Sequence, residues 1–512
     1  MRRLAVLALT LPLACSSDPP AADDGGSSDT GAADTADTAV TPTGEGGSEG
    51  GSEGDTGEAA CAHGPWDRGQ PIAMPELPAG DPAAGYEALL TRDYVSCGIP
   101  WELFGVAEGV LGVEEPLPGR TGKNAEVGHA WNVVSKSDGS ELVVSNCLQC
   151  HAGYFNGELI VGLGKATADF TTPLSDFADP LPDLPEISEA NAAFNKFKAR
   201  AAALGPYSTM MTIGANPAVM FAVVLLSHRD PVTLAWSDEP LYDLSSDFVL
   251  PADPPPWWRV AKKASNFANG MSRGDHRGTM VLASSLCTDS VEEAAPVLDY
   301  FADVQAYLAS IEPPRYPFAV DAALAAEGAD IFACECAGCH GTYDADDAAA
   351  ETFPNLLIPL DVIGTDPSFA TYAAAGGFYH HLREWFNASF YGMFSTVVTD
   401  DPTPGYTAPP LDGVWATAPY FHNGSVPSIE LVLDSAARPD AWRRVDLDST
   451  HFDEQALGWP WTATTPQADA PAGERKHIYD TGLFGYGNGG HVFGDHLSAD
   501  QRRAVLEYLK TL

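Results

Sequence analysis

The chain has 512 residues, with 27 Lys and Arg against 70 Asp and Glu, which gives a formal net charge of −43. This charge excludes nucleic acid as the main partner, because a phosphate backbone is bound by basic patches. Hydrophobic residues make up 45% and aromatic residues 10% of the chain, which excludes global disorder and suffices for the cores of about three domains.

The first fifteen residues are typical of an export signal: two arginines, an apolar stretch from Leu4 to Ala14, and then Cys15. This stretch is too short to span a bilayer as a helix. Its ending resembles a bacterial lipoprotein signal with Cys15 as the lipidated residue, although Pro12 stands where leucine is usual; simple secretion is the alternative. We expect an exported protein of the periplasm, cell envelope or outer membrane surface, attached to a membrane only through a lipid anchor.

Residues 16–60 contain eleven acidic residues and neither lysine nor arginine, mostly among Gly, Ser, Thr and Ala. Such a segment buries too little apolar surface to offset the entropy of ordering its chain. The sequence therefore predicts a disordered acidic tether between the signal and a folded body that begins near residue 61.

Two five-residue segments carry the chemistry, Cys147-Leu-Gln-Cys150-His151 and Cys336-Ala-Gly-Cys339-His340. Each is the C-x-x-C-H signature by which c-type haem is covalently attached. On a helical turn, residues at i, i+3 and i+4 share one face, so both thiols can bond the haem vinyl groups while the histidine reaches the iron. We expect two haem c groups, with the two histidines as proximal ligands.

Other uses of such cysteines are a zinc ribbon, a thioredoxin-like redox pair or structural disulfides. A zinc ribbon would pair the two C-x-x-C units, yet 185 residues separate Cys150 from Cys336 and each unit has its own histidine. Cys334 also forms a longer C-x4-C-H with Cys339, but the two-residue gap from Cys336 is the common one. The remaining thiols suggest two disulfides with three possible connectivities: Cys61, Cys97, Cys287 and Cys334.

Apolar periodicity between the two motifs predicts helices over 191–203, 216–226 and 290–311. Ser290 can cap the third helix, with Glu293 at the capping-box position. An amphipathic helix over 320–332 runs into the second motif, as at the opening of a cytochrome c domain.

A last helix, capped by Ser498 with Gln501, runs to Leu512. A closing helix of this kind packs against the first helix of a cytochrome c domain. We therefore expect a mainly α fold of two cytochrome c-type haem domains with long loops. The N-terminal domain, with a helical insert, spans 61–314 and the C-terminal domain spans 315–512.

The run Leu411-Asp-Gly-Val-Trp-Ala-Thr-Ala-Pro-Tyr-Phe-His-Asn-Gly-Ser-Val-Pro-Ser428 resembles the signature of the bacterial dihaem cytochrome c peroxidase superfamily. Within that superfamily, Gly487-Asn-Gly-Gly-His491-Val-Phe-Gly494 and the last seven residues are most similar to the rubber-oxygenase branch. The resemblance covers most of residues 140–512. It implies one haem at which peroxide or oxygen reacts, and a second haem with two protein ligands that moves electrons.

The resemblance also suggests ligands for the second haem. Peroxidases of the superfamily often use a methionine about fourteen residues beyond the histidine that matches His422, but Ala436 stands there and no methionine is near. We expect His491 to serve instead. The alternatives are that His491 is a solvent-exposed loop residue, or that His422 is the ligand although its family counterpart lies near the interface between the haems.

Two further roles follow from the resemblance. Thr417 and Pro419 match positions whose carbonyls hold an interdomain calcium in related peroxidases, so Ca²⁺ between the domains is expected. Trp258 could relay electrons between the haems, as a tryptophan does in the family. The alternative is that Trp258 is an ordinary aromatic residue of the core.

We expect residues 257–277 to form the distal side of the first haem. The Arg and Lys side chains of this segment could form ion pairs with the haem propionates. Asp275 or His276 could act as acid/base or as a sixth ligand. The alternative is a charged surface turn.

The leading functional hypothesis is a dihaem peroxidase, with H2O2 reduced at the N-terminal haem. Its electrons would arrive through the C-terminal haem from a cationic electron-donor protein or a small-molecule donor. The second hypothesis is an oxygenase of the rubber-oxygenase type that uses O2, and the third is a non-catalytic electron-transfer cytochrome.

Overall fold

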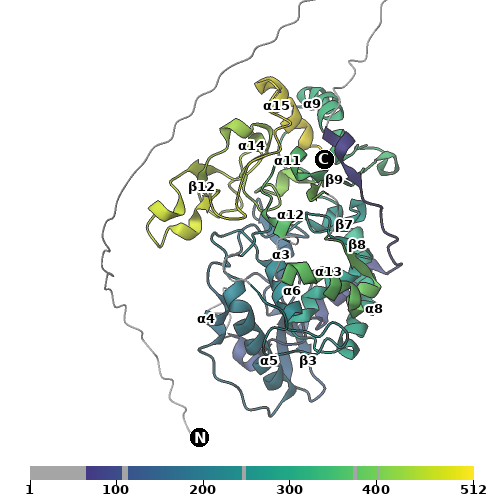
Figure 1. Ribbon diagram of the computed structural model, residues 1–512, viewed down its shortest axis with the longest axis vertical. Helices are drawn as coiled ribbons and strands as arrows, with labels where there is room; N and C mark the ends of the chain where they lie inside the picture. The colour runs from purple at the N-terminus through teal and green to yellow at the C-terminus, as the bar shows by residue number, and fades with distance from the viewer. Residues whose placement is uncertain (1–64, 106–113, 245–248, 373–377, 400–402) are drawn as a thin grey trace, which may run out of the picture. The chain divides into compact units, whose positions relative to one another are not determined.

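The computed structural model describes residues 65–105, 114–244, 249–372, 378–399 and 403–512 (Figure 1). The predicted signal, the tether and Cys61 lie outside these ranges. Within them, no helix is both long enough and apolar enough to cross a membrane.

The longer α-helices have ten or more residues and are α1 (Pro82–Thr91), α5 (Glu189–Leu204), α6 (Ala218–Ser227), α8 (Val291–Ala309), α9 (Ala322–Glu335), α13 (Phe378–Ala388) and α15 (Ala499–Leu509). The shorter helices are α3 (Leu148–His151), α4 (Leu174–Ala178), α7 (Arg277–Met280), α10 (Ala337–His340), α11 (Leu360–Ile363), α12 (Ser368–Tyr372) and α14 (Ile429–Leu433).

Short antiparallel strands connect these helices. They form sheets in the orders β1-β9-β11, β10-β8-β7, β13-β12-β14 and β2-β4-β3, and a β5-β6 hairpin. Their bounds are β1 (Gln70–Pro71), β2 (Ile99–Pro100), β3 (Trp131–Ser135), β4 (Glu141–Ser145), β5 (Ala152–Phe155), β6 (Glu158–Val161), β7 (Ser265–Asn266), β8 (Ser272–Gly274), β9 (Leu356–Pro359), β10 (Ser395–Val397), β11 (Gly405–Thr407), β12 (Ala441–Arg444), β13 (Trp461–Ala463) and β14 (Tyr479–Asp480).

The expectation of a mainly α fold needs correction, because helix accounts for 39% and strand for 14% and the fold is mixed α/β. The strands have two to five residues, too few for a clear alternating pattern in the sequence. One signal was available: Asp138-Gly139 joins the apolar runs of β3 and β4, and this dipeptide is a strong hairpin signal.

The predicted helices are present as α5, α6, α8, α9 and α15. The Ser290 hydroxyl accepts a hydrogen bond from the N–H of Glu293, as a cap should, while the Glu293 carboxylate accepts from the N–H of Asp289 rather than Ser290. At α15, Ser498 and Gln501 form the complete capping box.

The predicted packing of the closing helix is confirmed, since α15 lies beside α9 (Figure 1). The two helices approach closely at Gly328, where a Cβ would meet the carbonyl oxygen of Ala504 at 1.9 Å. Phe332 packs with Val505, Leu506 and Leu509 in one buried cluster. This pair supports the second C-x-x-C-H motif, which follows α9 directly.

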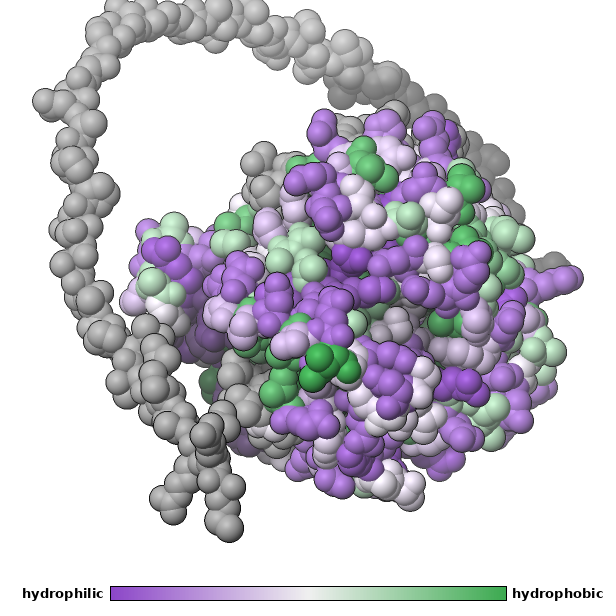
Figure 2. Space-filling view, turned by 90° about the horizontal axis from the view of Figure 1, so that it is seen from below, coloured by the Kyte–Doolittle hydropathy of each residue, from purple (hydrophilic) through white to green (hydrophobic). Residues whose placement is uncertain are grey.

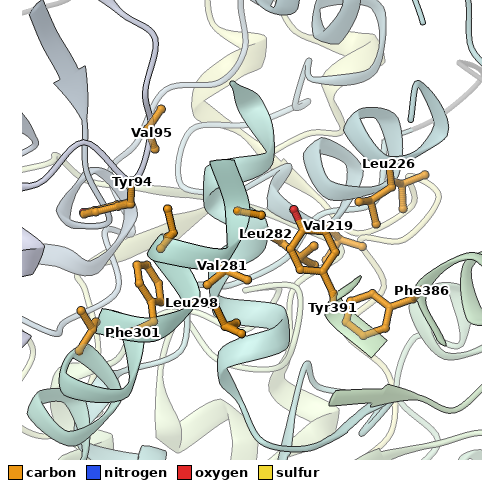
Figure 3. Close-up of a cluster of buried hydrophobic side chains, with 14 of the residues drawn as sticks. Tyr94, Val95, Val219, Leu226, Val281, Leu282, Leu298, Phe301, Phe386 and Tyr391 are labelled. Carbon is orange, nitrogen blue, oxygen red and sulfur yellow. The ribbon is translucent and has the colours of Figure 1, made fainter. Parts of the chain in front are cut away.

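The largest core cluster draws on both halves of the chain (Figure 3). Tyr94, Leu298 and Phe301 pack there in the same cluster as Phe386 and Tyr391, which belong to the predicted C-terminal domain. Strands also pair across the predicted boundary at 314/315, as β8 does with β10 and β1 with β9. The division into two domains stays a prediction. Within the folded body, the two halves share this buried cluster and pair their strands with each other.

A disulfide joins Cys97 and Cys287, with 5.5 Å between their Cα atoms. Cys334 is disulfide-bonded as well. The face drawn in Figure 2 is predominantly hydrophilic, with hydrophobic residues scattered over it.

Candidate functional site

The first C-x-x-C-H motif forms one helical turn after β4. The N–H of His151 donates to the carbonyl of Cys147 at 3.1 Å, which closes the turn and brings both cysteines and the histidine to one side. The Tyr94 hydroxyl accepts a hydrogen bond from the N–H of Cys147 at 2.9 Å. The thiols of Cys147 and Cys150 are free, and burial raises the pKa of Cys147 to about 11. The turn thus has the geometry that attachment of haem c requires.

The second motif forms an equivalent turn after α9, where the N–H of His340 donates to the carbonyl of Cys336 at 3.0 Å. Cys336 and Cys339 are free, and burial raises the pKa of Cys336 to about 12 and that of Cys339 to about 11. Cys334 is disulfide-bonded, so its sulfur is not free to bond a haem, whereas both thiols of the shorter motif, Cys336 and Cys339, are free. This arrangement favours attachment through Cys336 over the longer alternative.

One cavity of about 550 Å³ is lined by residues of both motifs. The motif residues on its wall are Cys150, His151, Cys336, Cys339 and His340, and four more lining residues are His276, His422, His491 and Lys263. Most other lining side chains are apolar. A mostly apolar cavity with free thiols and imidazoles on its wall fits a planar, covalently attached iron cofactor at each motif.

His340 is held in a ligating tautomer. Its Nδ1 lies 2.8 Å from the carbonyl oxygen of Pro409, so Nδ1 carries the proton and Nε2 is left for a metal. A backbone carbonyl at this position is the usual second contact of a metal-bound histidine.

His491 faces His340 across the cavity. The centroids of the two rings are 6.3 Å apart, with 48° between their planes. Two metal–imidazole bonds of about 2 Å each, with the short distance from nitrogen to each ring centre, span a separation of about 6 Å. Burial and the nearby His340 lower the pKa of His491 to about 4, so the ring is neutral, as a ligand must be.

The backbone around the cavity is strained in three places. His491 has a φ of 46°, Phe421 of 70° and Phe267 of 65°, all in the left-handed region. Each of these residues lines the cavity, and such conformations persist only where the surroundings impose them. His491 is fixed in part by its N–H, which donates to the carbonyl of Ile363 at 2.6 Å.

His151 stacks on Trp257, with ring centroids 5.1 Å apart and 27° between planes. Its Nδ1 has no hydrogen-bond partner, and burial lowers its pKa to about 4. The predicted Trp258 does not line the cavity. It is buried in the cluster around α9 and α15, and its Nε1 donates to the carbonyl of Asp412 at 2.8 Å. The tryptophan in contact with a motif histidine is thus Trp257, one residue earlier in the 3-10 helix η4 (Trp257–Lys262).

The structure separates the two acid/base candidates. His276 lines the cavity and is 2% exposed. Asp275 instead pairs with Arg277, at 2.6 Å from Nη2 and 2.8 Å from Nε, and is absent from the cavity wall. Burial, reinforced by Lys263, lowers the pKa of His276 to about 4. His276 is therefore a neutral imidazole near neutral pH.

Two cations of the 257–277 segment also lie on the cavity wall. Burial lowers the pKa of Lys263 to about 8, with Arg259 adding to the shift. Arg259 is buried and donates from Nε to the carbonyl of Asp412 at 2.9 Å, while its Nη2 has no partner. These groups fit the carboxylates of a haem, as expected for this segment. Lys262 is engaged elsewhere, with Glu351 and Asp412.

His422 also lines the cavity, and its ring is in contact with those of Tyr406 and Phe369. Its ring stacks on Tyr406, with centroids 4.1 Å apart and 19° between planes. Its Nε2 is buried without a hydrogen-bond partner, and burial lowers its pKa to about 4. His422 is thus the less suitable ligand for the site of His340.

Thr417 and Pro419, the predicted carbonyl ligands of calcium, both line the larger cavity, and Pro419 lines a second one as well. This second cavity of about 250 Å³ is also lined by Arg443 and Arg444. The carboxylate on that wall, Asp446, is exposed and bonded to His451. Across the described ranges, no group of three or more His, Cys, Asp and Glu could hold a metal ion. The calcium stays a prediction, and nothing below depends on it.

A family model described as "RoxA-like, cytochrome c-like" matches residues 405–443, which include His422 and the strand β11. This match supports a haem c cytochrome of the rubber-oxygenase-like branch.

The chain is also similar to two proteins of Sinorhizobium fredii (strain NBRC 101917 / NGR234), both named as uncharacterized. Protein y4iJ is 29% identical over 259 residues, 40% of this chain and 41% of that protein. Protein y4iM is 29% identical over 239 residues, 40% of this chain and 52% of that protein. The chain thus spans about half the length of the curated relatives it matches, or less.

Proposed function

We propose that the protein is a dihaem c-type oxidoreductase of the dihaem cytochrome c peroxidase superfamily, and that it reduces hydrogen peroxide. The observation that carries this proposal is the separation of 6.3 Å between the facing rings of His340 and His491, whereas the ring stacked on the other motif histidine, His151, is that of Trp257. The first arrangement suits electron transfer, and the second suits a reaction at an open iron position.

Each residue has a defined part. Cys147 and Cys150 hold the N-terminal haem and Cys336 and Cys339 the C-terminal one, by thioether bonds. The bound haems supply one-electron redox chemistry and the iron at which peroxide reacts. His151 and His340 are the proximal ligands, and His491 closes the second site to exogenous molecules.

His276 is the general acid–base residue that transfers the proton of the peroxide. A neutral imidazole with a pKa of about 4 accepts a proton from the incoming peroxide oxygen and returns it to the departing oxygen. Arg259 and Lys263 hold carboxylates of the cofactor. Trp257, stacked on His151, lies on the route by which electrons reach the N-terminal site.

A second candidate is an oxygenase of the rubber-oxygenase type, which would add O2 to an apolar substrate. The match of residues 405–443 to a RoxA-like domain favours it, as does the mostly apolar wall of the cavity. A chain with both sites closed by two protein ligands would be an electron-transfer cytochrome without catalysis.

The electron donor is a cationic small protein or a small molecule. Residues 61–512 carry 25 Lys and Arg against 59 Asp and Glu, a balance that attracts a cationic partner and makes its association rate sensitive to salt. The protein is exported to the periplasm or cell envelope, with lipidated Cys15 as its anchor.

An optical and EPR titration of the purified full-length holoprotein with dithionite, peroxide and air tests this function. We expect two haem c groups per chain, one high-spin and one low-spin, and rapid oxidation of the reduced protein by peroxide. Two low-spin haems inert to peroxide would instead indicate a pure electron carrier. No peroxide consumption with any reduced donor, together with a stable spectral change of the reduced protein in air, would favour the oxygenase.

The assignment of spin states needs variants that lose one attachment site each. Cys147→Ala/Cys150→Ala removes the N-terminal attachment, and Cys336→Ala/Cys339→Ala removes the C-terminal one. We expect the first variant to lose the high-spin signal and peroxide consumption. The second should keep a high-spin signal but fail to accept electrons from the donor.

A further inference from the structure

Arg438 is bonded to the loop that carries His491. Its Nη1 donates to the carbonyls of Asn488 and Gly490, at 2.8 and 2.6 Å. Its Nη2 donates to the carbonyl of His491 itself at 3.2 Å. The guanidinium thus binds the main chain of three of the four residues from 488 to 491.

The same guanidinium is anchored on the other side to the end of α14. Its Nε donates to the carbonyl of Leu431 at 2.7 Å and its Nη2 to that of Val432 at 3.1 Å. A guanidinium has five N–H donors, and five carbonyls accept from Arg438. All five hydrogen bonds of Arg438 go to main-chain carbonyls, and the carboxylates of Asp495 and Asp434 act on its charge from nearby.

The loop is also held by hydrogen bonds from the N–H of His491 to the carbonyl of Ile363 and from the Asn488 side chain to the carbonyl of Pro439, but Arg438 is the side chain that binds the carbonyls of residues 488, 490 and 491 together. Gly487, Gly489 and Gly490 contribute no side chains, and His491 adopts a left-handed φ of 46°, which costs free energy unless the surroundings impose it. The ring of Phe421 lies close to both Arg438 and His491. Its centroid is 5.0 Å from the guanidinium carbon of Arg438 and 5.9 Å from the centroid of the His491 ring.

We infer that Arg438 is a positioning residue that holds the His491 imidazole opposite His340 and so keeps exogenous ligands from the C-terminal haem. This inference rests on the proposed function, because it takes His491 as the distal ligand. Outer-shell partners of this kind typically contribute about 10- to 100-fold to the binding of a metal by its ligand. Without Arg438, the imidazole would leave the iron more often, and a small anion could take its place.

The test compares Arg438→Gln with Arg438→Lys in the full-length oxidised holoprotein. Lysine keeps the charge but has no planar fork, so we expect both variants to bind cyanide at the C-terminal haem about 10- to 100-fold more tightly than the wild type. Added imidazole should restore the wild-type low-spin EPR signal. Arg443→Gln, which removes the exposed ion pair between Arg443 in β12 and Glu474, is the matched control and should leave cyanide affinity unchanged.

The readout separates positioning from simple stabilisation. A purely structural Arg438 would lower the melting temperature of the variants and leave cyanide affinity and the EPR signal as in the wild type, which would overturn the inference. If Arg438→Gln does not fold, Arg438→Lys alone decides between these results. A wild-type C-terminal haem that is not low-spin would refute the His491 ligation, and thus the proposed function, before any variant is made.

Discussion

The imidazoles of His340 and His491 face each other with 6.3 Å between their ring centroids, although 150 residues separate them in the sequence. Each ring is fixed by backbone contacts: His340 through the carbonyl of Pro409, and His491 through Ile363 and Arg438. In the proposed function these two rings close the site of the C-terminal haem, whereas the ring beside His151 is that of Trp257.

His491→Ala should open this closed site. We expect loss of the low-spin EPR signal of the C-terminal haem and its return with added imidazole. His491→Met should keep the haem low-spin and raise its midpoint potential by on the order of 0.1 V, because a thioether ligand favours the reduced iron. Potentiometric titration measures this shift, and an unchanged potential in both variants would show that His491 is not a ligand.

The two adjacent tryptophans should behave differently. Trp257→Phe should perturb the optical spectrum of the N-terminal haem, because Trp257 stacks on His151. Trp258→Phe should leave that spectrum unchanged and lower the free energy of unfolding by about 1 kcal/mol, through loss of the hydrogen bond to the carbonyl of Asp412. Denaturant titration gives the second value. The reverse pattern would restore Trp258 as the residue next to the haem.

His276 and Asp275 form a similar pair of variants. His276→Leu should lower kcat/KM for peroxide by about 10²- to 10⁴-fold, the usual contribution of a general acid–base group. Asp275→Asn should change kcat/KM by less than about tenfold. It should instead lower the free energy of unfolding by about 1–3 kcal/mol, because it weakens the bonds to Arg277. Steady-state peroxide assays decide, and equal losses in both variants would argue against the assignment.

Burial of His276 also predicts acid sensitivity. Its pKa is about 4 in the folded protein and near 6.5 in an unfolded chain, so the unfolded state binds more protons between these values. Stability should therefore fall as the pH drops from about 6.5 to about 4, by up to about 3 kcal/mol from this residue. Urea titrations of the wild type and His276→Leu measure this effect. The variant should have a smaller slope with pH, and equal slopes would contradict the burial argument.

The residues of the two haem motifs could be predicted because their geometry is local. A spacing of three and four residues on one helical turn places the thiols and the histidine together in any fold. His491 required a resemblance, since no local pattern connects it with a motif 150 residues earlier. Five of the longer helices, α5, α6, α8, α9 and α15, could be predicted from their apolar periodicity and, at α8 and α15, from their caps, whereas α1 and α13 were not predicted.

Other features depend on contacts that the sequence does not encode locally. Trp257 and Trp258 are neighbours of identical chemistry, and only the 3-10 turn decides which ring reaches the cavity. Arg438 binds carbonyls, which every residue has, so no sequence pattern distinguishes it from a surface arginine. Several short strands pair across long sequence separations, as β8 and β10 do, and were not predicted.

The EPR spectrum of the oxidised variant Cys147→Ala/Cys150→Ala, which keeps only the C-terminal attachment site, tests the central claim most directly. If His340 and His491 both bind the iron of that haem, the spectrum contains a low-spin signal alone, and His491→Ala in the same background converts it to high-spin. A high-spin signal before the second substitution, or a low-spin signal that survives it, would contradict the account.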